Sequence, residues 1–136
     1  YVYLSNCNTA SFIDKELSNY FFDRPGNSMS EINKYSKKAF NASFVVYDSI
    51  FNQLNYNSKN IASIMCAIYY SFNNISKRVK TIDSKQERKE CKRILNDNYK
   101  KLSKYRKEIK NNIKSTSRIK RVIKKIICDY KLGIRR

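Results

Sequence analysis

The chain contains no histidine and no tryptophan, and it has only two glycines and one proline in 136 residues. Since tight turns and β-bulges depend on glycine and proline, this shortage argues against a β-sandwich or barrel and favours long helices with polar joints. No apolar run approaches the ~18 residues of a membrane span, and the start of the chain does not resemble a signal peptide. The chain does not begin with Met, as we expect of a fragment or a trimmed chain.

Residues for metal binding and catalysis are also scarce. The cysteines lie far apart, at Cys7, Cys66, Cys91 and Cys128. Structural zinc needs clustered Cys or His ligands, so we predict no metal site and expect reduced thiols in an intracellular protein. The sequence also lacks G-x-G-x-x-G, the phosphate-binding G-x-x-x-x-G-K-[ST] and a close carboxylate pair in an apolar setting. We therefore predict no catalytic residues, no cofactor and no enzymatic activity.

Positive charge is abundant, and it is concentrated in the second half. Residues 1–76 hold six basic and five acidic residues, whereas residues 77–136 hold 23 basic and six acidic residues, a net charge of +17. An array of that density attracts polyanions such as nucleic acid, acidic protein surfaces or anionic lipid. The charge limits the classes of partner without choosing among them.

Apolar residues recur at three- and four-residue spacing in five segments. The sequence predicts helices over residues 9–21, 28–52, 58–72, 84–114 and 117–133, with a turn at residues 23–26. The predicted apolar positions of the second helix are Ile32, Tyr35, Ala39, Phe40 or Ala42, Val46 and Ile50, and a bend at residues 43–46 is left open. Ser58 is the predicted cap of the third helix.

The third segment, residues 61–72, is apolar almost all round, which is typical of a helix that is buried on most sides. Its small residues, Ala62, Ser63, Cys66 and Ala67, would let neighbouring helices approach closely. We predict an all-α fold in which about five helices over residues 1–114 surround this central helix. A basic C-terminal helix, residues 115–136, packs on that bundle.

The residues around the third segment resemble a cyclin box. Residues 54–62, L-N-Y-N-S-K-N-I-A, resemble the junction between a helix ending in L-x-Y and the buried helix opening P-S-x-I-A-x-x-A-I, with Asn57 in place of the proline. Residues 12–20, 30–52, 85–91 and 118–129 resemble further helices of the second cyclin box and the C-terminal helix of cyclin H. The resemblance implies a cyclin-box-like helical bundle.

The same resemblance implies a function. A cyclin H-like protein is a regulatory subunit that binds and activates a cyclin-dependent kinase in a CDK-activating kinase or TFIIH-type complex, with no chemistry of its own. Its partners would be the kinase and the assembly factor of that complex, and its place would be the nucleus, in cell-cycle and transcription control. Such a protein acts by differential contact with two kinase states.

The alternative is a basic helical nucleic-acid-binding protein, such as a ribosomal, organellar RNP or viral DNA-associated component. The candidate contacts to a polyanion or partner are Lys100, Lys101, Lys104, Lys107, Arg118, Lys120, Arg121, Lys124 and Lys125. These bases are equally compatible with a solvated face, and we expect any nucleic-acid binding to be non-specific. Tyr99 and Tyr105 could stack on bases or lie in the core. We expect no membrane partner, because the apolar face of the last helix lacks Trp and Phe.

Overall fold

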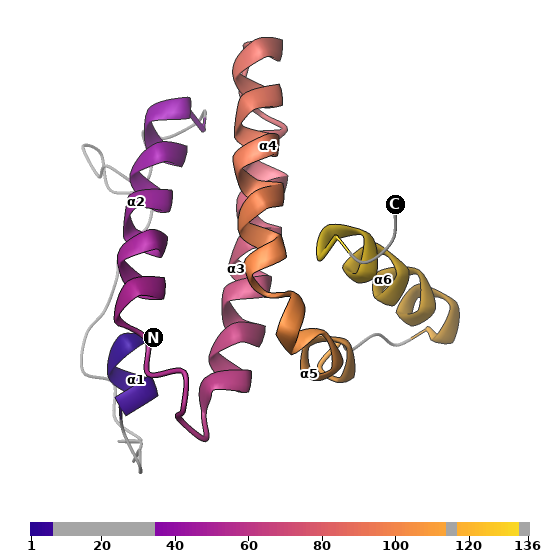
Figure 1. Ribbon diagram of the computed structural model, residues 1–136. Helices are drawn as coiled ribbons and strands as arrows, with labels where there is room; N and C mark the ends of the chain where they lie inside the picture. The colour runs from indigo at the N-terminus through magenta and orange to yellow at the C-terminus, as the bar shows by residue number, and fades with distance from the viewer. Residues whose placement is uncertain (7–34, 114–116, 134–136) are drawn as a thin grey trace, which may run out of the picture.

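A computed structural model describes three stretches of the chain, residues 1–6, 35–113 and 117–133 (Figure 1). Every regular element in these stretches is a helix, so the predicted all-α fold is confirmed. The elements are α1 (Val2–Asn6), α2 (Lys37–Gln53), α3 (Ile61–Val79), α4 (Lys85–Lys101), the 3₁₀ turn η1 (Ser103–Tyr105), α5 (Arg106–Asn111) and α6 (Arg118–Lys131). The predicted helix over 9–21, the turn at 23–26 and residues 28–34 of the predicted second helix lie outside the described residues. The prediction of one helix over 28–52 is wrong at residues 35 and 36, which are not helical, because the extended backbone of Ser36 caps a helix that begins at Lys37. The sequence analysis did not predict α1.

Serine side chains begin three of these helices. The hydroxyls of Ser36, Ser84 and Ser117 accept hydrogen bonds from backbone N–H groups three residues later, at the starts of α2, α4 and α6. Such caps satisfy N–H groups that have no partner inside the helix. The predicted cap at Ser58 is wrong, because Asn60 occupies the capping position of α3 and the Ser58 hydroxyl accepts from the Asn60 N–H instead.

The buried face of α2 is aromatic. Phe40, Phe44 and Phe51 are buried on it, and their four- and seven-residue spacing places them on one side of the helix. The predicted inclusion of Val46 is wrong, because 58% of this side chain is exposed. The aromatic rings decide which face of α2 is buried, because burying an aromatic side chain removes more apolar surface from water than burying valine. The helix continues through residues 43–46 without interruption.

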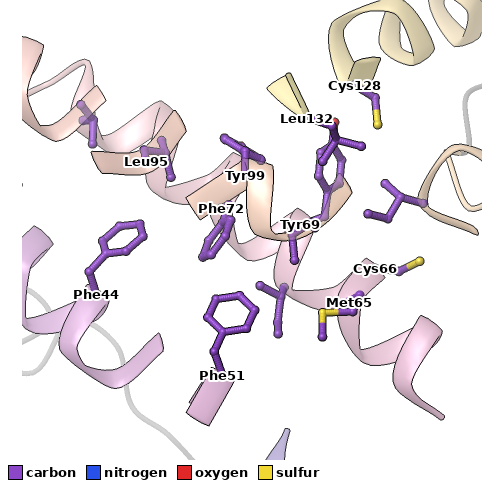
Figure 2. Close-up of a cluster of buried hydrophobic side chains, with 14 of the residues drawn as sticks. Phe44, Phe51, Met65, Cys66, Tyr69, Phe72, Leu95, Tyr99, Cys128 and Leu132 are labelled. Atoms are coloured by element: carbon purple, nitrogen blue, oxygen red, sulfur yellow. The ribbon is translucent and has the colours of Figure 1, made fainter. Parts of the chain in front are cut away.

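Helix α3 provides the centre of the core. Its buried residues are Ile64, Met65, Cys66, Ile68, Tyr69, Phe72 and Val79, and it contacts α1, α4, η1 and α5. The Phe72 ring lies 5.6 Å from that of Phe44 on α2 and 5.5 Å from that of Tyr99 on α4 (Figure 2). One side chain therefore joins three helices. Of the small residues, Cys66 is buried, Ala62 and Ala67 are half-buried, and Ser63 is exposed.

Two helix ends differ from the prediction. Helix α3 continues to Val79, seven residues past the expected end, because Ile75 and Val79 extend the apolar face of Phe72. The single helix expected over 84–114 is interrupted at Leu102, where η1 separates α4 from α5. The break redirects α5, and Ile109 and Ile113 are both buried beyond it. A short 3₁₀ turn preserves the apolar spacing, so periodicity alone does not reveal it.

Helix α6 lies on the side of α4 away from α2 (Figure 1) and contacts α4 and α5. Only a few of its side chains are buried, namely Cys128 and Asp129, followed by Leu132 just after the helix. The predicted end at Gly133 agrees with the structure, where Gly133 has φ +73° and its N–H bonds to the Tyr130 carbonyl oxygen. A residue with a side chain would be strained in this left-handed conformation.

Candidate functional site

The nine predicted contact residues do not form one site. Four of them are on α4, η1 and α5, and five are on α6. All are exposed except Lys125, which is half-buried. Only Lys124 lines the cleft described below, whereas Lys100 lines a different hollow on α4 and pairs with Asp97 at 3.0 Å. The predicted contact residues therefore belong to separate surfaces of the protein.

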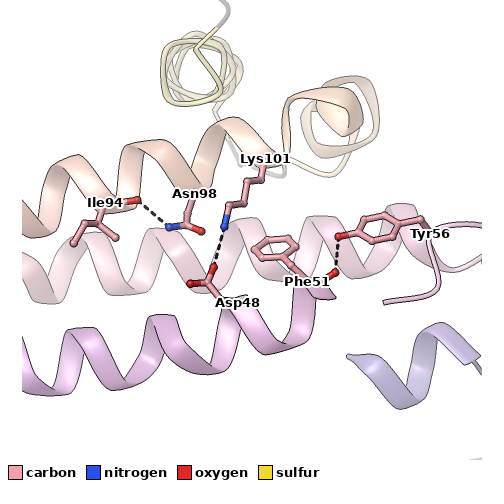
Figure 3. A network of polar contacts seen from close by, with 6 residues as sticks. All are labelled: Asp48, Phe51, Tyr56, Ile94, Asn98 and Lys101. Atoms are coloured by element: carbon pink, nitrogen blue, oxygen red, sulfur yellow. Dashed lines mark hydrogen bonds and ion pairs between the residues drawn. The ribbon is translucent and has the colours of Figure 1, made fainter. Parts of the chain in front are cut away.

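Lys101, at the end of α4, and Lys104, on η1, lie against α2 and the segment that follows it. The Lys101 ammonium lies 2.9 Å from the Asp48 carboxylate and 5.2 Å from the centre of the Phe51 ring (Figure 3). The Lys104 ammonium lies 5.9 Å from the centre of the Tyr56 ring, whose hydroxyl donates to the Phe51 carbonyl oxygen. These contacts give Lys101 and Lys104 a structural explanation that requires no ligand.

A basic cleft of about 630 Å³ opens between α3 and α6. Its described lining consists of Tyr69, Tyr70, Asn73, Asn74, Ser76, Lys77, Lys80, Ile113, Lys124, Ile127 and Lys131. Four of these residues are lysines and none is acidic. Among the ion pairs between described residues, none involves Lys77, Lys80 or Lys131. We call this the basic cleft, and the ammonium groups of Lys77, Lys80 and Lys131 are available to an anion.

Lys131, a half-buried lining residue of the cleft, is held by neutral groups. Its ammonium donates to Asn73 Oδ1 at 2.5 Å and to the Tyr99 hydroxyl at 3.2 Å, and that hydroxyl donates to the same Asn73 oxygen at 2.7 Å. Burial lowers the pKa of Lys131, and the nearby ammonium groups of Lys80 and Lys77 lower it further. A half-buried cation among other cations is destabilised, and a bound anion would relieve that cost.

A buried carboxylate fixes α6 beside the cleft. Only 2% of the Asp129 side chain is exposed, and its two oxygens lie 2.7 Å from Arg106 Nε and 2.8 Å from Lys110 Nζ. The Arg106 hydrogen bond, reinforced by Lys110, lowers the pKa of Asp129 to about 2. The carboxylate is therefore charged at neutral pH, and its charge is already neutralised within α5. Asp129 thus holds in place the helix that carries Lys124 and Lys131.

Aromatic rings form part of the wall. Tyr70 is 42% exposed, its hydroxyl donates to the Asn112 carbonyl oxygen at 2.7 Å, and its ring makes an edge contact with Tyr69. The tyrosines considered in the sequence analysis lie elsewhere: Tyr99 is 1% exposed and Tyr105 packs half-buried against the core. The structure therefore assigns Tyr99 to the core, where it cannot stack on a base.

Three of the four cleft lysines, Lys77, Lys80 and Lys131, were not predicted from the sequence. A signal for them was present, because Lys124, Ile127 and Lys131 follow the i, i+3, i+7 spacing of one helix face. Lys77 and Lys80, at the end of α3, are three residues apart and therefore also lie on one helix face. What the sequence could not supply is that these two faces oppose each other, since this depends on how α6 docks.

The described residues include no group of three or more His, Cys, Asp or Glu side chains that could hold a metal ion. Cys66, Cys91 and Cys128 are free and buried, and burial raises the pKa of each thiol. A raised pKa reduces the thiolate fraction, which makes these cysteines poor nucleophiles. The described helices include none that is both long and apolar enough to cross a membrane.

Comparisons with protein-family models, with curated proteins and with solved structures find no match to this chain.

Proposed function

We propose that the protein is a helical nucleic-acid-binding protein that holds the phosphate backbone of its ligand in the basic cleft. The observation that supports this most is the grouping of Lys77, Lys80, Lys124 and Lys131 around a cleft whose described lining has no carboxylate. Structural ion-pair networks normally place acids among such bases. Lys77, Lys80 and Lys131 form no ion pair with a described residue, so their counter-charge would come from the ligand.

The size of the cleft and the spread of its charges agree with a chain of phosphates. Its volume of about 630 Å³ is within the range of ligand pockets, and its charges come from two helices rather than from one point. Lysines recognise phosphate as point charges and do not read base edges, so binding should depend strongly on salt and weakly on sequence. The exposed ring of Tyr70 offers a surface on which one base of a single strand can stack.

The test is a salt titration of binding to a labelled single-stranded RNA of about 20 nucleotides. Replacing Lys77 and Lys80 by Gln should weaken binding about tenfold near 0.1 M salt and reduce the slope of log K against log salt by about 1.4, since each phosphate contact on a single strand contributes about 0.7. Both positions are exposed, so the variant should fold normally.

The matched control replaces Lys104 and Lys107 by Gln, which removes the same charge outside the cleft. Its salt slope should equal that of the wild type. Equal losses in the two variants would show that binding follows net charge rather than the cleft, and would remove the support for this site.

A second candidate is the cyclin-like kinase regulator that the sequence resemblance implies. The position of α3 supports it, because this helix contacts α1, α4 and α5 and its Phe72 ring packs against α2, as expected for the third helix of a cyclin box. In this proposal the protein contributes apolar contacts and no chemistry. Pull-down from nuclear extract should then recover a cyclin-dependent kinase with its assembly factor. Recovery of RNA-containing particles in place of any kinase favours the first proposal.

A further inference from the structure

Helix α6 carries an apolar stripe that lies exposed on the described structure. The stripe consists of Ile119, Val122, Ile123, Ile126, Ile127 and Tyr130, with exposed fractions between 45% and 72%. Ile127, the least exposed of them, also lines the basic cleft. Spacing of three and four residues places them along one face of the helix. The protein side of α6 is a different face, which buries Cys128 and is followed by Leu132. A continuous patch of this kind on a polar surface marks an interaction site.

The surroundings of the stripe are strongly basic. Helix α6 holds six basic residues and a single acid, Asp129. That acid is buried and its two oxygens are already bound to Arg106 and Lys110. The outer side of the helix therefore presents an apolar stripe with cationic margins, and an occupant must offer apolar surface together with negative charge.

This requirement separates the classes of occupant. A second copy of α6 would supply apolar surface but would place its bases against the same bases, which repel. Nucleic acid would supply charge but no apolar layer for a row of isoleucines. An anionic lipid bilayer supplies both, because its acyl boundary accepts the stripe while lysine and arginine side chains extend to the headgroups.

We propose that α6 lies on the surface of anionic lipid membranes, with Ile119, Ile123 and Ile126 inserted at the acyl boundary. At 14 residues the helix is about 21 Å long, which suits lying in the interface. Tyr130 is 69% exposed at one end of the stripe, and tyrosine is a residue that favours the membrane interface. The lack of Trp and Phe led the sequence analysis to expect no membrane partner, and the exposure of this stripe is the observation that revises that expectation.

The test is co-sedimentation of the full chain with vesicles of phosphatidylcholine containing about 30% phosphatidylserine, compared with phosphatidylcholine alone. The wild type should bind only the anionic vesicles. Replacing Ile123 and Ile126 by Asn should reduce the partition coefficient by at least about tenfold, because both inserted side chains are lost. The matched control replaces Val45 and Val46 by Asn. These exposed valines on α2 lie far from α6 in the chain, so binding should stay within about twofold.

Three outcomes would overturn the proposal. The wild type could fail to bind anionic vesicles, or the two Asn variants could bind equally well. Thirdly, the wild type could form a concentration-dependent dimer that the variant with Asn at Ile123 and Ile126 does not form. That result would mean that the stripe binds a second copy of the chain. The proposal is independent of the nucleic-acid function, and the variants separate the two. The Lys77 and Lys80 variant should lose RNA affinity while binding vesicles within about threefold of the wild type, and the isoleucine variant should show the reverse.

Discussion

Replacing Asp129 by Asn should release α6 from the rest of the protein without unfolding the core. The wild-type carboxylate is 2% exposed and accepts charge-assisted hydrogen bonds of 2.7 Å from Arg106 and 2.8 Å from Lys110. Asparagine has nearly the same shape, so packing is retained. Its neutral amide, however, has only one oxygen to accept from these two cations, and its NH₂ group repels the other.

The expected loss follows from the exposure of the partners. Breaking a fully buried ion pair costs about 3–5 kcal/mol, because a charge is left without water. Here the Arg106 and Lys110 side chains are 41% and 24% exposed, so both can recover part of their hydration. We therefore expect the free energy that holds α6 in place to fall by about 2 kcal/mol, the value of a hydrogen bond to a charged group.

Hydrogen exchange of the α6 backbone amides measures this opening directly, and 2 kcal/mol corresponds to about thirtyfold faster exchange. Amides in α3 should be unaffected. The matched control is Asp97→Asn, which breaks the exposed Lys100 pair and should change exchange little, because surface pairs contribute about 0–1 kcal/mol. If Asp129→Asn and Asp97→Asn have the same effect on α6, the buried ion pair does not hold this helix.

The pH dependence has a defined sign. The pKa of Asp129 is lowered from an ordinary value of 3.8 to about 2, so the folded state favours the charged carboxylate. Its contribution is fully present above about pH 4 and is lost as the pH falls toward 2. The difference in α6 protection between the wild type and Asp129→Asn should shrink over that interval.

Two further predictions concern the core. Phe72→Ala should lower the free energy of unfolding by about 3–5 kcal/mol, because its fully buried ring contacts α2 and α4. As a control, Val46→Ala on the exposed side of α2 should change this free energy by less than about 0.5 kcal/mol. Urea denaturation measures both values. Cys66→Arg should abolish cooperative folding, because it places an unpaired charge in a dry core, and a soluble variant with a sharp thermal transition would contradict the assignment of this position.

Sequence periodicity predicted the helical class and the central helix, because both depend on local spacing of apolar residues. The segment around Cys66 and Phe72 is apolar on nearly all sides, so its burial needed no knowledge of its neighbours. The register of α2 was less accessible, since choosing Phe44 over Val46 depends on which residues its neighbours present. The break at Leu102 was invisible because a 3₁₀ turn keeps the apolar positions in phase.

The candidate site was harder to predict than the fold. Charge density identified the basic half, but most of the bases selected from local clusters either pair with acids, as Lys101 does with Asp48, or lie outside the cleft. Lys77 and Lys131 are 54 positions apart in the sequence, and only the docking of α6 places both on the same cleft. In the same way, sequence alone gives α6 an apolar face but does not say that the protein leaves it exposed.

The hydrogen-bonded triad of Asn73, Tyr99 and Lys131 takes one residue from each of α3, α4 and α6. A ligand that contacts Lys131 together with Lys77 or Lys80 therefore favours the docked arrangement of α6, and its binding free energy adds to the stability of that arrangement. At a concentration of about 100 times its dissociation constant, such a ligand would stabilise docking by about 2.7 kcal/mol. Because the linkage is reciprocal, a change that loosens α6 weakens ligand binding in proportion to the docked population that it removes.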